Sequence, residues 1–151
     1  MYKKILVPLD GSKRAEAILP HVEEMAQRYG VKVIFLTVVD SLPVGIGPEP
    51  NYSPHDPHHQ QRQVDEAAHY LAGVTGEFRE KGIKADTIIE GGPVIDEIID
   101  VSMREDADLI AMASHGRTGL SRAFYGSVAA GVLHRVDRPL FLVRAVDDDE
   151  S

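Results

Sequence analysis

Short apolar runs that alternate with helically spaced segments constrain this sequence of 151 residues more than any other feature. A strand covered by helices on both faces is apolar along its whole length, and such strands form parallel sheets. Because crossovers between parallel strands are right-handed, the alternation leaves few other arrangements. It predicts a single doubly wound α/β domain with helices on both faces of the sheet. The predicted strands are residues 3–9, 31–39, 83–90, 108–114 and 140–146.

The segments between these runs carry the spacing and the end signals of helices. Residues 12–29 have apolar positions three and four apart, with Ser12 as a predicted N-cap and Gly30 as a predicted stop. Pro20 lies inside this segment, where we expect it to kink the helix or remove a hydrogen bond. Pro93 suits the first position of a later helix. Helical spacing resumes over 64–82, 93–103 and 127–136.

Residues 40–60 break the alternation, because five prolines and two glycines forbid a regular element there. We expect an irregular segment, either functional or disordered, at the end of the sheet where ligands bind. It contains His55, His58 and His59, which would need further ligands to complete a tetrahedral metal site. The sequence offers no nearby cluster of such ligands, so solvated histidines are the simpler interpretation.

The composition excludes several classes of function. Sixteen Lys and Arg against 24 Asp and Glu give a net charge of −8, and the clustered cations of nucleic-acid-binding proteins are absent. The lack of cysteine excludes disulfides and thiolate zinc sites. No apolar run approaches the roughly 18 residues that span a bilayer, so we expect no membrane partner. The sequence shows no targeting signal, from which we expect a cytoplasmic protein. Residues 147–151 are interpreted as an acidic C-terminal tail that follows a domain of residues 1–146.

Ligands of a doubly wound sheet bind beyond the carboxyl ends of the strands, so the residues just after each strand are the candidates. After the fourth strand, Gly116 and Gly119 let the backbone approach a ligand, and successive N–H groups there can form an anion-binding concavity. Gly126 and Ser127 then open a helix, whose N-terminus suits phosphate. Two such elements favour a polyphosphate. The glycines are equally compatible with simple turns, and Ser127 with an N-cap.

Asp10 ends the first predicted strand and precedes Gly11 and Ser12. Its carboxylate can accept hydrogen bonds from ribose hydroxyls or bond adenine, although an Asp-Gly turn in which it bonds its own backbone is the commoner role. The sequence has neither a Gly-x4-Gly-Lys-Ser/Thr phosphate loop nor a Gly-x-Gly-x2-Gly dinucleotide fingerprint. These absences argue against a Rossmann dehydrogenase.

Three segments resemble the universal stress protein family, in the right order and spacing over nearly the whole chain. They are the opening Ile5–Ser12, the stretch Ala113-Ser-His-Gly116-x9-Gly126-Ser127 and the ending Arg138–Val143. The resemblance implies an adenine-nucleotide-binding fold of five parallel strands in the order 3-2-1-4-5. The family's nucleotide-binding branch carries a Gly-x2-Gly-x9-Gly-Ser/Thr motif, whose first glycine is Ala113 here. Alanine leaves the backbone free to approach a ligand if its φ is negative, and costs about 1 kcal/mol if its φ is positive.

By position, the resemblance implies two groups of nucleotide contacts. The base and ribose would meet Pro8, Leu9, Asp10, Val38 and Met112. The phosphate motif would comprise Ala113, His115, Gly116, Gly126, Ser127 and the backbone of Val128 and Ala129. Arg117 is a further candidate from the sequence itself, either as a local positive charge in an acidic protein or as a solvent-facing loop residue.

The resemblance implies a stress-response protein that binds ATP, with or without Mg²⁺, and acts as a sensor or switch. One carboxylate, one histidine and backbone donors suffice to bind a nucleotide but supply little for phosphoryl transfer, so we expect at most slow hydrolysis. Family members commonly dimerise through the last strand. A sheet edge at residues 140–146 must be paired or protected, which predicts a homodimer. The alternative is an interaction scaffold of the same fold that binds no nucleotide and docks an unidentified protein partner.

Overall fold

A computed structural model describes residues 2–39, 57–115 and 127–145, apart from the side chains of Pro57 and His115. Within these residues, strands alternate with helical elements along the chain, as the apolar pattern predicts. The strands are β1 (Lys4–Pro8), β2 (Lys32–Val39), β3 (Ala85–Gly91), β4 (Leu109–His115) and β5 (Leu140–Ala145). The helical elements are the 3₁₀ turn η1 (Ala15–Ile18), α1 (Leu19–Tyr29), α2 (Pro57–Glu80), α3 (Val94–Arg104) and α4 (Ser127–Arg135).

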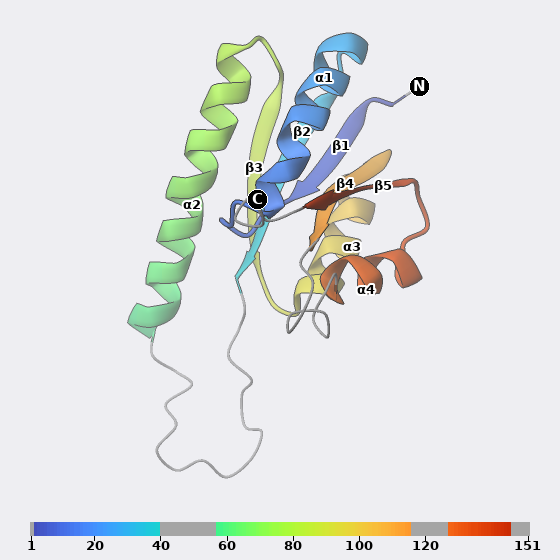
Figure 1. The fold of residues 1–151 in the computed structure, drawn as a ribbon. Coiled ribbons are helices and arrows are strands. Elements are labelled where there is room, and N and C mark those ends of the chain that lie inside the picture. The colour runs from blue at the N-terminus through green and yellow to red at the C-terminus, as the bar shows by residue number, and fades with distance from the viewer. Residues whose placement is uncertain (1, 40–56, 116–126, 146–151) are drawn as a thin grey trace, which may run out of the picture.

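The five strands form one parallel sheet in the order β3-β2-β1-β4-β5 (Figure 1), which confirms the predicted topology. The chain moves outward from β1 through β2 to β3, and then returns to the other side of β1 to form β4 and β5. Its direction across the sheet therefore reverses between β1 and β4. In doubly wound sheets this reversal is where ligands bind.

Helices cover both faces of the sheet, and the central strand supplies side chains to both layers. Ile5 and Val7 pack in the core beneath α1 and α2, whereas Leu6 packs in the core beneath α3 and α4. All three side chains are fully buried. Successive side chains of a strand point to opposite faces, so a strand between two layers is apolar at every position. This explains why the sequence of β1 is a continuous apolar run.

The first helix differs from the predicted segment of residues 12–29 because of Pro20. The 3₁₀ turn η1 comes first, and α1 begins at Leu19 with Pro20 in its first turn. Proline has no N–H, and the first N–H groups of a helix have no intrahelical acceptor in any case. Pro20 therefore starts a helix instead of kinking a longer one. Ser12 lies ahead of η1 and not next to α1, and its Oγ accepts a hydrogen bond from the N–H of Ala15 at 3.1 Å, which is the type of bond that an N-cap makes.

Helix α2 begins earlier than the spacing from residue 64 predicts. It starts at Pro57, so residues 57–60 are helical and not irregular as expected, while residues 40–56 lie outside the described part of the chain. Its buried side chains begin at Ala67, and its first turns extend beyond the strand ends (Figure 1). Polar residues that contact no core carry no apolar periodicity, so the pattern misses them. No helix among the described residues has the length and hydropathy that a membrane span requires.

Two residues, Gly30 and Pro93, were predicted to mark the ends of helices, and the structure shows where each one lies. Gly30 ends α1 as predicted, with a left-handed φ of 67° and an N–H that donates to the carbonyl of Ala26 at 2.8 Å. Pro93 is the N-cap of α3, in an extended conformation, one residue before the helical position predicted for it. Both residues act through the backbone: glycine permits a positive φ, and proline fixes a negative one.

The carboxylate of Asp108 joins the N-terminal segment to the turn before β4. Its Oδ2 accepts hydrogen bonds from the backbone N–H groups of Lys3, at 2.7 Å, and Lys4, at 2.8 Å. These two bonds, with the positive charges of Lys3 and the N-terminus, hold the pKa of the Asp108 carboxyl below its ordinary value. The charged form of Asp108 therefore stabilises the folded state.

Alanine substitutions at two glycines should shift stability in opposite directions. Gly30→Ala should lower the free energy of unfolding by about 1 kcal/mol, because an L residue is strained at a φ of 67°. Gly73→Ala, inside α2 with open space around the added methyl group, should raise it by up to about 1 kcal/mol. Urea unfolding midpoints measure both. Shifts of the same sign would contradict the assignment of Gly30 to a left-handed helix end.

Asp108→Asn should destabilise the protein near neutral pH by on the order of 1 kcal/mol, the low end for charge-assisted hydrogen bonds because the group is partly exposed. A lowered folded-state pKa adds stability above the ordinary value of 3.8, and this stability is lost as the pH falls through the folded value. The gap between the two proteins should therefore close below pH 3.8. Thermal unfolding across pH measures it, with the exposed Asp100→Asn as a control that should show no such convergence.

Candidate functional site

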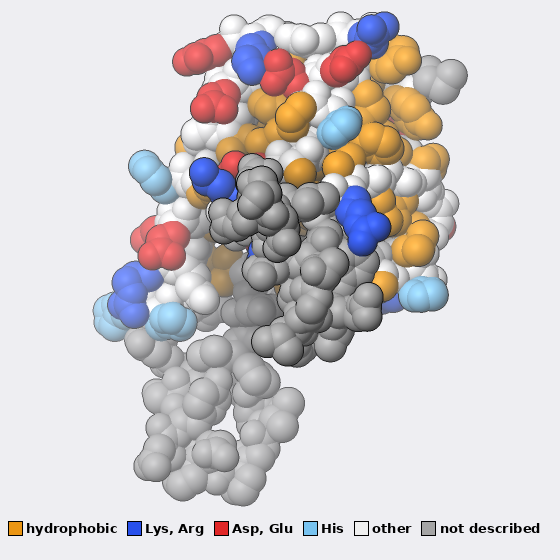
Figure 2. All heavy atoms as spheres, in the orientation of Figure 1, with side chains coloured by type: hydrophobic (Ala, Val, Ile, Leu, Met, Phe, Trp, Pro, Cys, Tyr) orange, Lys and Arg blue, Asp and Glu red, His pale blue; other side chains and the backbone are white. Residues whose placement is uncertain are grey.

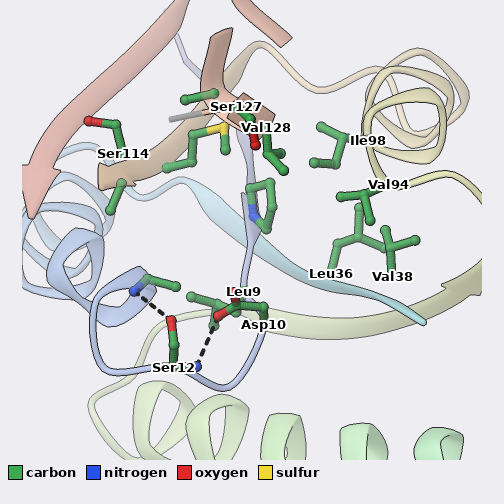
Figure 3. Close-up of a pocket in the computed structure, with 15 residues that line it drawn as sticks. Leu9, Asp10, Ser12, Leu36, Val38, Val94, Ile98, Ser114, Ser127 and Val128 are labelled. Carbon is green, nitrogen blue, oxygen red and sulfur yellow. Dashed lines mark hydrogen bonds between the residues drawn. The ribbon is translucent and has the colours of Figure 1, made fainter. Parts of the chain in front are cut away.

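A cavity of about 280 Å³ lies at the carboxyl ends of β1, β2 and β4, where the direction of the chain across the sheet reverses. The sides of this cavity come from α3, from the first turn of α4 and from the segment between β1 and η1 (Figure 3). Its described lining residues are Pro8, Leu9, Asp10, Ser12, Ala15, Leu36, Val38, Val94, Ile98, Met112, Ala113, Ser114, Ser127, Val128 and Ala129.

Most of the residues predicted as ligand contacts meet at this cavity. They come from four separate parts of the chain: the end of β1, the end of β2, the end of β4 and the start of α4. His115 is the last residue of β4, but its side chain is outside the described part of the structure, as are Gly116, Arg117 and Gly126. The predicted residues that line the cavity are Pro8, Leu9, Asp10, Val38, Met112, Ala113, Ser127, Val128 and Ala129.

Several lining residues were not predicted. Ser12 lies four residues after the end of β1, and Ser114 is the last residue but one of β4. The rule that ligands bind at the carboxyl ends of strands was therefore a signal that could have found both. Leu36, Val94 and Ile98 carry no such signal, because they look like ordinary core residues in the sequence. Figure 3 shows these three near Val38, on the opposite side of the cavity from Ser114. They make one wall of the cavity apolar.

Asp10 forms the Asp-Gly turn that the sequence analysis gave as its commoner role. Its Oδ1 accepts a hydrogen bond from the N–H of Ser12 at 2.9 Å, across Gly11 with a φ of 88°. Ser12 in turn accepts the N–H of Ala15 through its Oγ. These bonds fix the carboxylate at the cavity, and no hydrogen bond within the described part of the chain uses its second oxygen, Oδ2. The turn and a ligand-binding role are thus compatible.

Val38 presents backbone polar groups above the end of β1. The ladder between β1 and β2 pairs Pro8 with Leu36, and its last bond runs from the N–H of Leu9 to the carbonyl of Leu36. Backbone groups two residues apart on a strand point to the same side. The N–H and C=O of Val38 therefore point past the end of β1, beside the cavity that Val38 lines. One donor and one acceptor lie side by side there.

Ala113 lies inside β4, where it pairs with Val143 of β5. Among the described residues, Asp106 is the only one other than glycine with a positive φ, so Ala113 has an ordinary strand conformation. The sequence left open whether Ala113 has a positive, strained φ, and the structure shows that it does not. Its methyl group adds bulk at the cavity but costs no backbone strain.

The start of α4 supplies the polar end of the cavity. Ser127 is the first helical residue and is exposed, Val128 is partly buried, and Ala129 is buried against the core. The first N–H groups of a helix have no intrahelical acceptor and carry a partial positive charge. The lining residues within the described chain include no Lys or Arg. Among the described residues, backbone amide groups and the Ser127 hydroxyl are the groups at this end that could meet an anion.

The histidine-rich stretch does not form a metal site within the described residues. His58 and His59 lie in the first turn of α2, while His55 is outside the described part of the chain. Neighbouring helical residues do not face each other, so these two rings do not converge on one ion. No group of three or more metal-ligating side chains is found among the described residues.

The chain matches known proteins along nearly its full length. The profile of the universal stress protein family covers residues 1–144. Universal stress protein MJ0577 of Methanocaldococcus jannaschii is 31% identical over 155 residues, which cover 95% of this chain and 96% of the relative. The solved structure of MJ0577 superposes with a TM-score of 0.82 at 30% identity and covers 98% of this chain and 99% of that one.

Two more distant structures share the fold. One is a universal stress protein in complex with cAMP, with a TM-score of 0.69, 18% identity and coverage of 96% of this chain and 98% of that one. The other is a universal stress family protein from Arabidopsis thaliana with AMP bound, with a TM-score of 0.68, 18% identity and coverage of 98% and 94%. At such identity the likeness concerns the fold alone. The family profile and the similarity to MJ0577 establish that this chain belongs to the universal stress protein family.

Proposed function

We propose that the cavity binds an adenine nucleotide, ATP above all, and that the protein acts as a nucleotide-dependent sensor or switch in a stress response. The observation that carries the proposal is the meeting of three kinds of group at one place: apolar walls, the Asp10 turn and the first turn of α4. Each suits a different part of a nucleotide. Proteins of the same family and fold in complex with AMP and cAMP add support.

The base is expected between the apolar walls, with its polar edge on Val38. Adenine accepts a hydrogen bond at N1 and donates one from N6, which matches the neighbouring N–H and C=O that Val38 directs past the end of β1. Guanine presents a donor at N1 and an acceptor at O6, the reverse order. The side chains of Met112 and Val128 offer apolar contact to the ring faces.

The ribose and phosphates are expected on the polar side. The free Oδ2 of Asp10 is placed to accept ribose hydroxyls, while the N–H groups and the Ser127 hydroxyl at the start of α4 suit phosphate oxygens. Gly116, Arg117, His115 and Gly126 complete the phosphate site in this proposal. Because the described lining holds a single carboxylate and no cation, we expect at most slow hydrolysis.

Calorimetric titration tests the proposal, with and without Mg²⁺. We expect ATP to bind the purified protein and GTP to bind more weakly. Ala113→Leu should lower the ATP affinity roughly tenfold or more, about 1.4 kcal/mol, because the larger side chain fills the cavity that Ala113 lines. Ala130→Leu, at an exposed position of α4 that does not line the cavity, is the matched control and should bind ATP normally.

A clear negative result is available. If the folded protein gives no heat with adenine nucleotides and releases none on denaturation, the proposal is wrong. The chain would then be better regarded as an interaction scaffold of this fold.

The switch is proposed to act as a homodimer in which β5 pairs with β5 of a second copy. Ile110 of β4 pairs with Leu140 and donates to the carbonyl of Pro139, so the backbone groups of Leu140, Leu142 and Arg144 face away from the sheet. Hydrophobic side chains gather on this side of the molecule (Figure 2), and Leu142 is 38% exposed. An unpaired edge of this kind favours strand addition.

The opposite edge of the sheet, β3, is partly covered by α2. The Nε of Arg79 donates to the carbonyl of Ala85 at 2.8 Å, and the guanidinium forms an ion pair with Asp86. The hydroxyls of Thr75 and Thr87 bond at 2.8 Å. An edge guarded by a charged side chain resists pairing with another strand. This difference favours β5 as the dimer interface.

Leu142→Lys should weaken the dimer at least roughly tenfold, because it places a like charge on each copy at the shared edge. Met103→Lys replaces another exposed hydrophobic side chain, on α3, and should leave the dimer intact. Analytical ultracentrifugation over a range of protein concentrations measures both. A dimer that survives Leu142→Lys unchanged would rule out pairing through β5.

A further inference from the structure

A second cavity, of about 460 Å³, lies on the other face of the sheet behind the candidate nucleotide site. It separates the ends of β1 and β2 from α2. Asp10 and Val38 line both cavities, so these two residues form the partition between them. Whatever holds this partition in place also sets the shape of the nucleotide site. The residues of the second cavity are Asp10, Gly11, Thr37, Val38, Val39, Gln63, Glu66, Ala67 and Tyr70.

Tyr70 is one of the α2 residues that line the second cavity, and it bonds to the segment that follows β1. Its ring is partly buried, and its hydroxyl donates a hydrogen bond to Oε2 of Glu16 in η1, 54 residues away in the sequence. Burial raises the pKa of the Tyr70 phenol, and the bond to Glu16 with the negative charges of Glu16 and Asp10 raises it further. The phenol therefore keeps its proton and remains a donor throughout the neutral range.

Glu16 follows a segment that is ordered by overlapping local hydrogen bonds, the first of which is made by Asp10. The carboxylate of Asp10 accepts from Ser12, the hydroxyl of Ser12 accepts from Ala15, and the N–H of Glu16 donates to the carbonyl of Lys13 at 3.1 Å. Figure 3 shows the first two of these bonds at the edge of the nucleotide cavity. Asp10, Ser12 and Ala15 all line that cavity. We call residues 10–16 the β1–η1 wall.

We propose that Tyr70 is a positioning residue, which holds the β1–η1 wall through Glu16 in the shape that receives a nucleotide. The inference rests on the proposed function of the cavity. Residues 10–14 of the wall belong to no helix or strand, and Tyr70 attaches the far end of the wall, Glu16, to α2. A wall ordered in advance spares the ligand the entropic cost of ordering it. Tyr70 itself lines the second cavity and is not among the described residues that line the candidate nucleotide site.

Tyr70→Phe is the informative substitution, because it keeps the ring and its packing and removes only the hydroxyl. In the ligand-free protein, amide hydrogen exchange of residues 10–16 should become faster. The dissociation constant for ATP, measured by calorimetry, should rise by about three- to tenfold, the range expected for one lost hydrogen bond. Tyr29→Phe, at a tyrosine that is 60% exposed at the end of α1, is the matched control and should change neither quantity.

Variants of Glu16 separate the hydrogen bond from packing. Glu16→Gln keeps an oxygen that accepts from Tyr70 and should bind ATP nearly as the parent does. Glu16→Ala removes the acceptor and should match Tyr70→Phe, and the double variant with Tyr70→Phe should bind no worse than either single one. Additive losses in the double variant would mean that the two residues act separately, and would overturn the proposal.

The two proposals fail in different ways. If the parent protein binds ATP but Tyr70→Phe binds it equally well, the positioning role is wrong and the nucleotide site stands. If the parent binds no adenine nucleotide, the proposed function is wrong. The hydrogen-exchange experiment alone then decides whether Tyr70 holds the β1–η1 wall. Faster exchange in Tyr70→Phe would then uphold the attachment of the wall to α2, and unchanged exchange would overturn it.

Discussion

The early end of the central strand is the constraint on which the candidate site depends. β1 has 5 residues, whereas its neighbour β2 has 8 and its neighbour β4 has 7. In register, β2 continues for three residues beyond the partner of Pro8, and β4 pairs with β1 only as far as Leu6. Two long strands that flank a short one leave a gap with unpaired backbone groups on its sides. Because unpaired polar groups are costly to bury, such a gap is suited to a ligand that pairs with them.

The segment that follows β1 connects this gap to the rest of the molecule. Asp10 stands between the two faces of the sheet, and the hydrogen bonds from Asp10 to Ala15 lead to Glu16 and so to Tyr70. The cavity of the candidate site belongs to the layer of α3 and α4, but one of its sides is attached to the layer of α1 and α2. The sheet thus separates two helical layers that remain linked through one turn.

The sequence predicted the sheet well because its strands are buried on both faces and therefore unmistakably apolar. It predicted helix starts less well, since these depend on local backbone chemistry: Pro20 opens α1 where a kink was expected, and the polar start of α2 has no core contact to impose a pattern. For the site, residues after strands could be found by position, and the family resemblance added Val38 and Met112. Leu36, Val94 and Ile98 could not be found, because a cavity wall and a core look alike in sequence.

The strand conformation of Ala113 has a consequence for how the family is classified. A signature that demands glycine here treats the position as a conformational requirement, yet the chain adopts an ordinary extended backbone that any small residue can share. Screening by that signature would set aside proteins whose backbone at this position is the same as in this chain. If the cavity binds a nucleotide as proposed, the criterion at the end of the fourth strand is side-chain size, which can be read directly from any sequence.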